Sequence, residues 1–212
     1  MGTQENLNKA ALFWYNFLMD EVIVAKNKKF IVETVKAKHP DHTTYICTWS
    51  NRKYLLRTFV TGFDQALKDY KTLKRAGINM AKVCFHDDEK KIIVFDYFPE
   101  DDCLTALSKG PLPDIYFDAL FSLYRFARFS KVALDWEPQN FMLRGSQMVY
   151  LPTKWAPLTE ENPLEKEGIR TWYLGKEGRG LLARKGYDIS GLPSFEDNVV
   201  NKSIVLSTVR YW

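Results

Sequence analysis

The sequence predicts an α+β fold with two lobes, in which a small antiparallel sheet is followed by a mainly helical part. Two observations support this prediction. Five short segments rich in Val, Ile, Thr and Tyr lie between residues 30 and 97, separated by polar turns as in hairpin-linked strands. Residues 62–76 and 112–129 instead carry apolar side chains at helical spacing. With 212 residues, 46% of them hydrophobic, the chain is long enough for one compact domain or two small lobes.

Three of the expected strands follow one another directly and predict an antiparallel meander. Polar residues at 39–42 and 50–53 separate them, and two further strands flank a polar turn at residues 87–90. The five expected strands are Phe30–Lys36, Thr43–Trp49, Tyr54–Phe59, Val83–His86 and Ile92–Tyr97. Together with two of the expected helices they define a first lobe, residues 1–98, built on a five-stranded sheet.

Three helices are expected. The first covers residues 6–20, whose apolar side chains recur at helical spacing and predict packing onto the body of the domain. The second covers residues 62–76 and ends at Gly77, which predicts a glycine C-cap. The third, residues 112–129, belongs to the second lobe, residues 99–212.

Residues 131–158 carry the pattern on which the functional interpretation depends. Asp135 and Asn140 have the spacing D-x-x-x-x-N, and two short apolar segments follow them around a polar turn at residues 144–147. This order predicts a β-hairpin with an acid and an amide on the loop that leads into it. In an isolated D-x-x-x-x-N, such side chains are most often groups that stabilise a turn.

The pattern resembles the catalytic loop of the protein kinase-like superfamily, H-R-D-x-x-x-x-N followed by two short strands and D-F-G. The expected order of strands and helices also resembles the N-lobe of that superfamily, with a hinge at residues 98–102. The resemblance covers roughly residues 28–158 and leaves room only for an abbreviated second lobe, similar in size to the RIO-type and lipopolysaccharide core sugar kinases. It implies that Asp135 is the catalytic base and that Asn140 is a ligand of Mg²⁺.

Several charged groups of the family's site are replaced in this chain. Thr153 stands at the place of the metal-binding D-F-G aspartate, and a neutral hydroxyl is a weaker magnesium ligand than a carboxylate. Glu137 stands where the family has a lysine two residues after the catalytic acid, and Ala133 replaces the histidine of H-R-D. We therefore expect the implied cofactors, ATP and Mg²⁺, to bind weakly or not at all.

The resemblance also implies a set of cofactor-binding residues, namely Arg57, Asp69, Asp96 and Phe98. Arg57 takes the place of the lysine of V-A-I-K, and its planar guanidinium is not equivalent to a compact ammonium. Its helix partner would be Asp69, which is one methylene shorter than the family's glutamate. Residues 28–45 contain no glycine, so the glycine-rich loop that lets backbone amides approach the phosphates is missing.

Trp136 directly follows the expected catalytic acid, where the family has a small or aliphatic residue. Its ring could crowd the mouth of the site, stack on a ligand ring, face a protein partner or belong to the core. The sequence leaves these alternatives open, as it does for Trp155, Trp172 and Trp212.

Composition limits the other classes of function. The net charge of +4 is compatible with an acidic or phosphate-bearing ligand but does not demand nucleic acid. The three cysteines are far apart and without metal spacing, which predicts free thiols in a reducing compartment and hence a cytoplasmic protein. No apolar run reaches the roughly 18–20 residues that cross a bilayer, and the acidic start is unlike a secretory signal.

These observations leave three functions. The first is a pseudokinase, a kinase-like fold kept as a binding or regulatory module for an unknown protein partner or an acidic ligand. The second is an atypical active kinase for a sugar, lipopolysaccharide-type or protein hydroxyl, in which Glu137 helps Asn140 to hold the metal. The basic segment 166–185 would suit a sugar-phosphate substrate. The third is an unrelated α+β interaction protein.

Overall fold

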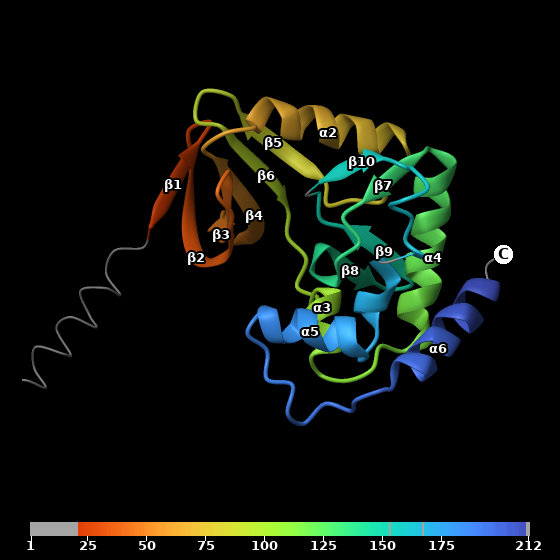
Figure 1. Cartoon of the computed structure of the whole chain (residues 1–212). Coiled ribbons are helices and arrows are strands. Elements are labelled where there is room, and N and C mark those ends of the chain that lie inside the picture. Colours follow the sequence, from red (N-terminus) through yellow and green to blue (C-terminus); the bar gives the residue numbers. More distant parts are fainter. Residues whose placement is uncertain (1–20, 153, 167, 211–212) are drawn as a thin grey trace, which may run out of the picture. The chain divides into compact units, whose positions relative to one another are not determined.

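The computed structural model of the chain describes residues 21–152, 154–166 and 168–210 (Figure 1). Over these residues the predicted α+β class is confirmed. By its contacts the chain divides into two compact units. The sheet unit comprises Met1–Phe63 and Lys82–Tyr97, and the second unit comprises Asp64–Ala81 and Phe98–Trp212. The helix expected over residues 6–20 lies outside the described residues.

The sheet unit is built on one antiparallel sheet of six strands in the order β1-β2-β3-β4-β6-β5. The expected count of five was wrong, because β1 pairs with β2 as an additional edge strand. This strand is only four residues long. Lys26 and Asn27 join it to β2, and both have a positive φ. Lysine is not a residue that marks such a turn in a sequence. The strands are β1 (Val22–Ala25), β2 (Lys28–Lys38), β3 (His42–Trp49), β4 (Arg52–Phe59), β5 (Val83–Asp87) and β6 (Ile92–Asp96).

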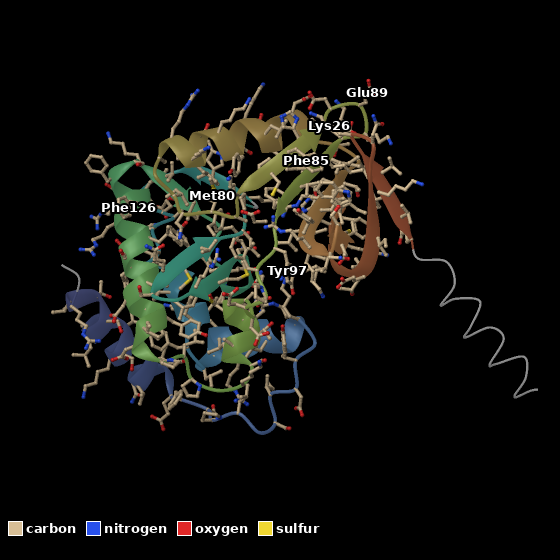
Figure 2. All side chains as sticks on the ribbon, turned by 180° about the vertical axis from the view of Figure 1, so that it is seen from behind. Lys26, Met80, Phe85, Glu89, Tyr97 and Phe126 are labelled. Carbon is tan, nitrogen blue, oxygen red and sulfur yellow. The ribbon has the colours of Figure 1, made fainter. Side chains whose placement is uncertain are left out.

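Hydrogen bonds join the two edges of this sheet and curl it. The Asp87 carboxylate accepts the backbone N–H of Lys26 at 2.7 Å and that of Lys90 at 3.1 Å. The Lys90 ammonium in turn donates to the Val24 carbonyl at 2.9 Å. The turns that carry Lys26 and Glu89 accordingly lie together in Figure 2. Because these backbone N–H groups stabilise the ionised carboxylate, they hold the pKa of Asp87 below its usual range.

The second unit combines helices with two small antiparallel sheets, β7 with β10 and β8 with β9. Helix α4 packs against β7 and β9, and its buried face forms the centre of the unit's core (Figure 1). The helices are α2 (Phe63–Arg75), α3 (Cys103–Leu107), α4 (Asp114–Phe129), α5 (Lys176–Arg184) and α6 (Asp197–Val209), with 3₁₀ turns η1 (Pro138–Asn140) and η2 (Gly168–Trp172). The strands are β7 (Val132–Leu134), β8 (Phe141–Arg144), β9 (Gln147–Tyr150) and β10 (Trp155–Pro157).

Helix α2 ends as predicted but belongs, by its contacts, mostly to the second unit. Gly77 has a φ of 75°, and the N–H of Ile78 donates back to the carbonyl of Leu73 at 3.1 Å, which confirms the glycine C-cap. Leu73 and Ile78 are buried in the core of the second unit. Asn79 accepts the N–H of Tyr150 at 2.9 Å, so the segment after the helix is bonded to β9. These contacts explain why α2 groups with the second unit, whereas the order of elements in the sequence predicts it in the first lobe.

Helices α5 and α6 lie in the segment after residue 158, where the sequence predicts no clear element. Helix α5 contains Gly178 and Gly180, which weaken the helical signal. Helix α6 carries apolar residues on its exposed sides as well as on its buried side, so it lacks a clear amphipathic period. Among the described residues, we find no helix that is both long and apolar enough to cross a membrane.

Candidate functional site

The candidate site is the loop from Asp135 to Asn140, which we call the 135–140 loop. It begins where β7 ends and leads through η1 into the β8–β9 hairpin, whose predicted existence is confirmed. Both ends of the loop are anchored by the backbone. The N–H of Asp135 donates to the Lys154 carbonyl at 3.2 Å, and the Asn140 carbonyl accepts the N–H of Leu151 at 2.7 Å. The loop is thus held at β10 and at the end of β9.

Asn140 closes the loop on itself, and it lies on the same loop as Asp135, as the spacing predicted. Its side-chain Nδ2 donates to the carbonyl of Asp135 at 3.2 Å, and its backbone N–H donates to the carbonyl of Glu137 at 3.0 Å. The residue is buried. This arrangement uses the nitrogen of the amide to shape the loop and leaves the oxygen, Oδ1, as the atom suited to accept a hydrogen bond or ligate a cation.

Trp136 belongs to the core and does not lie at a mouth of the site. Its ring is 6% exposed and stacks on Phe141, with ring centroids 5.9 Å apart and planes inclined by 3°. Trp172, from η2, donates its indole N–H to the carbonyl of Trp136 at 2.8 Å. A Cβ at Gly168 would lie 2.6 Å from the Cβ of Trp136, so the chain passes this ring too closely for any side chain. Trp172 is fully buried, and the rings of Trp136 and Trp172 anchor the loop to the core of the second unit.

The loop brings the carboxyl group of Asp135 close to that of Glu137. Burial raises the pKa of this half-buried carboxyl group, and the nearby carboxylate of Glu137 raises it further. The N–H of Glu137, the Asn140 side chain and the Lys154 ammonium favour the ionised form but do not offset these effects. The hydrogen bond from the Glu137 N–H to Oδ1 is long, at 3.4 Å. Asp135 is therefore held in a place that disfavours its charge.

We predict that Asp135→Asn stabilises the protein at pH 7–8, because the amide keeps the shape of the side chain without a charge. The gain should be on the order of 1 kcal/mol, or about 2–4 °C in melting temperature for a chain of this length. A carboxyl group whose pKa is raised by folding destabilises the ionised native state, and this cost vanishes as the pH falls through the raised pKa. The difference between the two proteins should therefore shrink on acidification.

Thermal melts of both proteins between pH 4 and pH 8 measure this difference. Asp118→Asn, on the exposed face of α4, is the control and should change the melting temperature little. A marked loss of stability for Asp135→Asn at neutral pH would show that the carboxylate charge is needed to hold the loop.

The magnesium site that the resemblance implies stays a prediction. Over the described ranges we find no cluster of three or more His, Cys, Asp or Glu side chains that could hold a metal ion. The side-chain oxygens of the loop come from Asp135, Glu137, Gln139 and Asn140, so it offers two carboxylates, and that of Glu137 already accepts a hydrogen bond from the Gln139 side-chain amide. Magnesium in a phosphate-transfer site needs well-placed carboxylate ligands. Thr153, the other expected ligand, lies outside the described residues, and its role stays a prediction.

Two of the expected cofactor-binding residues lie on adjacent strands of the sheet unit. Arg57, on β4, donates from Nε to the hydroxyl of Thr44 at 3.1 Å, and its guanidinium lies 5.5 Å from the centre of the Phe95 ring. Asp96, at the end of β6, accepts a hydrogen bond from the thiol of Cys84 at 3.0 Å. Arg57 is thus engaged with side chains of its own sheet.

The other two lie in the second unit. Asp69, on α2, accepts a hydrogen bond from the Gln65 side chain at 2.8 Å. Phe98 is buried, and the guanidinium of Arg144 lies 5.1 Å from the centre of its ring. Since Arg57 and Asp69 belong to different units, the pairing expected between them stays a prediction.

Lys154 and Trp172 contribute to the site but were not expected there. Lys154 anchors Asp135 through its carbonyl and contributes the nearby positive charge. Trp172 supports the loop from a segment more than thirty positions along the chain. Only the position of Lys154, one residue after the expected metal ligand, gave any signal in the sequence.

No family model matches the sequence, and no curated protein matches it either. Among solved structures, 1113 chains match. One of them is the crystal structure of the BubR1 kinase domain, which is 11% identical with a TM-score of 0.46. The match covers 68% of this chain and 56% of that domain, so the chain spans little more than half of the domain's length.

Proposed function

We propose that this chain has a protein kinase-like fold and acts as a binding or regulatory module in which Mg²⁺–ATP chemistry is impaired. The observation that carries the proposal is the pair of carboxylates on the 135–140 loop. Glu137 lies close enough to Asp135 to raise its pKa, at the position where the family places a cation. The module's partner would be another protein or an acidic, phosphate-bearing ligand.

Phosphoryl transfer depends mainly on neutralising the charge of the phosphates and aligning the attacking hydroxyl. Two neighbouring carboxylates on the loop would repel the phosphoryl group that they should help to transfer. Lys154 is the cation whose charge favours the ionised form of Asp135, and its effect is smaller than those of burial and Glu137. The loop therefore carries the acid and the amide that the resemblance implies without the charge balance of such a site.

The sheet unit supports the same proposal. Arg57, which stands in place of the phosphate-binding lysine, contacts Thr44 and Phe95 within the sheet. Residues 28–45, which form β2, the turn after it and the first half of β3, contain no glycine. Backbone amides approach phosphates closely where glycines leave room for them, and this segment lacks that feature.

One observation favours the alternative of an atypical active kinase. A half-buried carboxyl group with few hydrogen bonds and a raised pKa is what a positioned general base requires. In that case Asp135 would accept the proton of a sugar, lipopolysaccharide-type or protein hydroxyl. Glu137 would then have to contribute to the metal site with Asn140, in competition with its bond to Gln139.

Thermal melts with Mg²⁺–ATP test the proposal. A ligand at 100 times its dissociation constant stabilises a protein by about 2.7 kcal/mol, which is an increase of roughly 5–10 °C for a chain of this length. We expect millimolar Mg²⁺–ATP to raise the melting temperature of the wild type by less than about 1 °C.

Magnesium alone, ATP with a chelator, and the Asn140→Ala variant are the controls. A large shift that needs both magnesium and ATP and that Asn140→Ala abolishes would contradict the proposal and favour the active kinase.

A further inference from the structure

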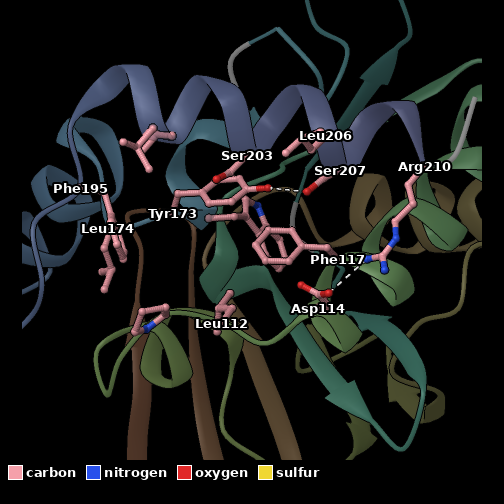
Figure 3. A pocket seen from close by; sticks show the side chains of 14 residues that line it. Leu112, Asp114, Phe117, Tyr173, Leu174, Phe195, Ser203, Leu206, Ser207 and Arg210 are labelled. Atoms are coloured by element: carbon pink, nitrogen blue, oxygen red, sulfur yellow. Dashed lines mark hydrogen bonds and ion pairs between the residues drawn. The ribbon is translucent and has the colours of Figure 1, made fainter.

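The second unit contains a cavity of about 500 Å³ that none of the residues of the 135–140 loop lines. It lies between the start of α4, the segment after η2, and α6 (Figure 3). A volume of this size is typical of small-molecule sites, which are mostly apolar with a few placed polar groups. Its apolar wall includes Leu112, Phe117, Leu174, Phe195, Val200 and Leu206.

Two stacked aromatic rings and a hydrogen bond form one side of the cavity wall. Phe117 and Tyr173 stack with ring centroids 4.7 Å apart and planes inclined by 19°. The hydroxyl of Tyr173 is hydrogen-bonded to that of Ser207 at 3.0 Å, so this polar atom is satisfied within the wall (Figure 3). An apolar ligand body can therefore lie against these rings without leaving a buried hydroxyl unpaired.

Among the described residues that line the cavity, the charged ones are Arg210 and Asp114, which lie together at one end. They form an ion pair with Nη1 and Oδ2 3.2 Å apart (Figure 3). Their side chains are 61% and 78% exposed, respectively. Exposed pairs of this kind contribute little to stability, so Arg210 can exchange the carboxylate of Asp114 for that of a ligand at little cost.

Each member of this pair lies at the helix end that suits its charge. Asp114 is the first residue of α4, whose partly positive N-terminus favours negative charge, and Arg210 follows α6, whose partly negative C-terminus favours positive charge. A ligand carboxylate that replaces that of Asp114 on Arg210 therefore keeps a negative charge at the start of α4. An apolar cavity with a partly exposed arginine at one end suits an apolar molecule with one carboxylate.

We propose that this cavity binds an apolar monocarboxylate, with the hydrocarbon body against Phe117 and Leu206 and the carboxylate on Arg210. This site is separate from the 135–140 loop, and the proposal does not rest on the proposed function. Trp172 is the residue that the two places share, because it lines the cavity and holds the carbonyl of Trp136. We therefore leave Trp172 unchanged in the test.

Calorimetric titration of the full chain with decanoate tests the proposal. Decanol and decylamine, which have the same hydrocarbon chain but a neutral or a positively charged head group, are titrated for comparison. We expect saturable binding of decanoate, and binding of decylamine that is at least about tenfold weaker because an ammonium cannot accept the hydrogen bonds that the guanidinium of Arg210 donates. Arg210→Gln should weaken decanoate about tenfold and leave decanol unchanged. Lys202→Gln, an exposed position on α6 outside the cavity, should change neither.

A second variant fills the cavity. Ser203→Phe places a ring inside it and should abolish binding of both decanoate and decanol. Val205→Phe adds the same ring to an exposed position of α6 that does not line the cavity, and it should bind decanoate as the wild type does. Circular dichroism checks that each variant is folded. If Ser203→Phe is not folded, the effect of Arg210→Gln on decanoate binding tests the proposal.

Three outcomes would overturn the proposal. The first is an absence of decanoate binding, and the second is binding that neither Ser203→Phe nor Arg210→Gln weakens. The third is a wild-type dimer in sedimentation that Leu206→Asp dissociates, because this would show that a second copy of the chain covers the cavity.

Discussion

Gly178→Ala is expected to destabilise the protein by about 3 kcal/mol or more, because overpacking against a rigid neighbour cannot relax locally. A Cβ at this buried glycine of α5 would lie 1.9 Å from the carbonyl oxygen of Tyr173 and 3.2 Å from that of Thr171. Both contacts are with backbone, so the helix would have to move away from the segment that carries Trp172. Urea unfolding at neutral pH measures the loss.

Gly180→Ala, two positions along the same helix, is the matched control. A Cβ there would meet only the end of the Arg184 side chain, at an ordinary 3.6 Å. Because alanine favours a helix by up to about 1 kcal/mol over glycine, this variant should be as stable as the wild type or more stable. Equal destabilisation by both substitutions would mean that α5 does not pack on residues 171–173 as described.

Phe141→Ala is expected to cost about 3–5 kcal/mol, the range for removing a large aromatic ring from a packed core. The ring is fully buried, and its centroid lies 5.9 Å from that of Trp136, 5.4 Å from that of Trp172 and 5.1 Å from that of Tyr150. Its loss leaves a cavity directly under the 135–140 loop. Urea unfolding gives the change in stability, and tryptophan emission reports whether the two indoles become exposed.

Phe129→Ala makes the same change at the end of α4, where the side chain is 90% exposed. Its effect should stay within about 0.5 kcal/mol. A loss for Phe141→Ala no greater than that for Phe129→Ala would contradict the core position of Phe141 and the support that it gives to the loop.

Most of the sheet could be predicted from the sequence, because β-branched and aromatic residues between polar turns are a local signal. The segments Thr43–Trp49 and Tyr54–Phe59 lie within β3 and β4. Strand β1 could not be predicted in this way, since a four-residue strand depends on the partner that it pairs with. Helix α6 could not be predicted either, because it carries apolar residues on several sides. Its sequence therefore lacks the 3.6-residue hydrophobic period that is typical of a surface helix.

The candidate site was predictable where it is local in sequence and not where it is built from distant segments. The spacing of Asp135 and Asn140 placed both on one loop, as the hydrogen bond between them shows. The sequence left the role of Trp136 open, because its burial depends on Phe141, Trp172 and the close passage of Gly168. The direction of the pKa shift of Asp135 likewise depends on burial, which spacing alone does not reveal.

Transfer of the γ-phosphoryl group from Mg²⁺–ATP, measured for the wild type and Asp135→Asn, tests the impaired chemistry most directly. Sugar and protein hydroxyls are offered as acceptors, and thermal melts show that both proteins are folded. We expect no transfer above the enzyme-free control from either protein. Transfer by the wild type that falls by about 10²–10⁴-fold in Asp135→Asn would contradict the account, because a positioned general base contributes that much to the rate.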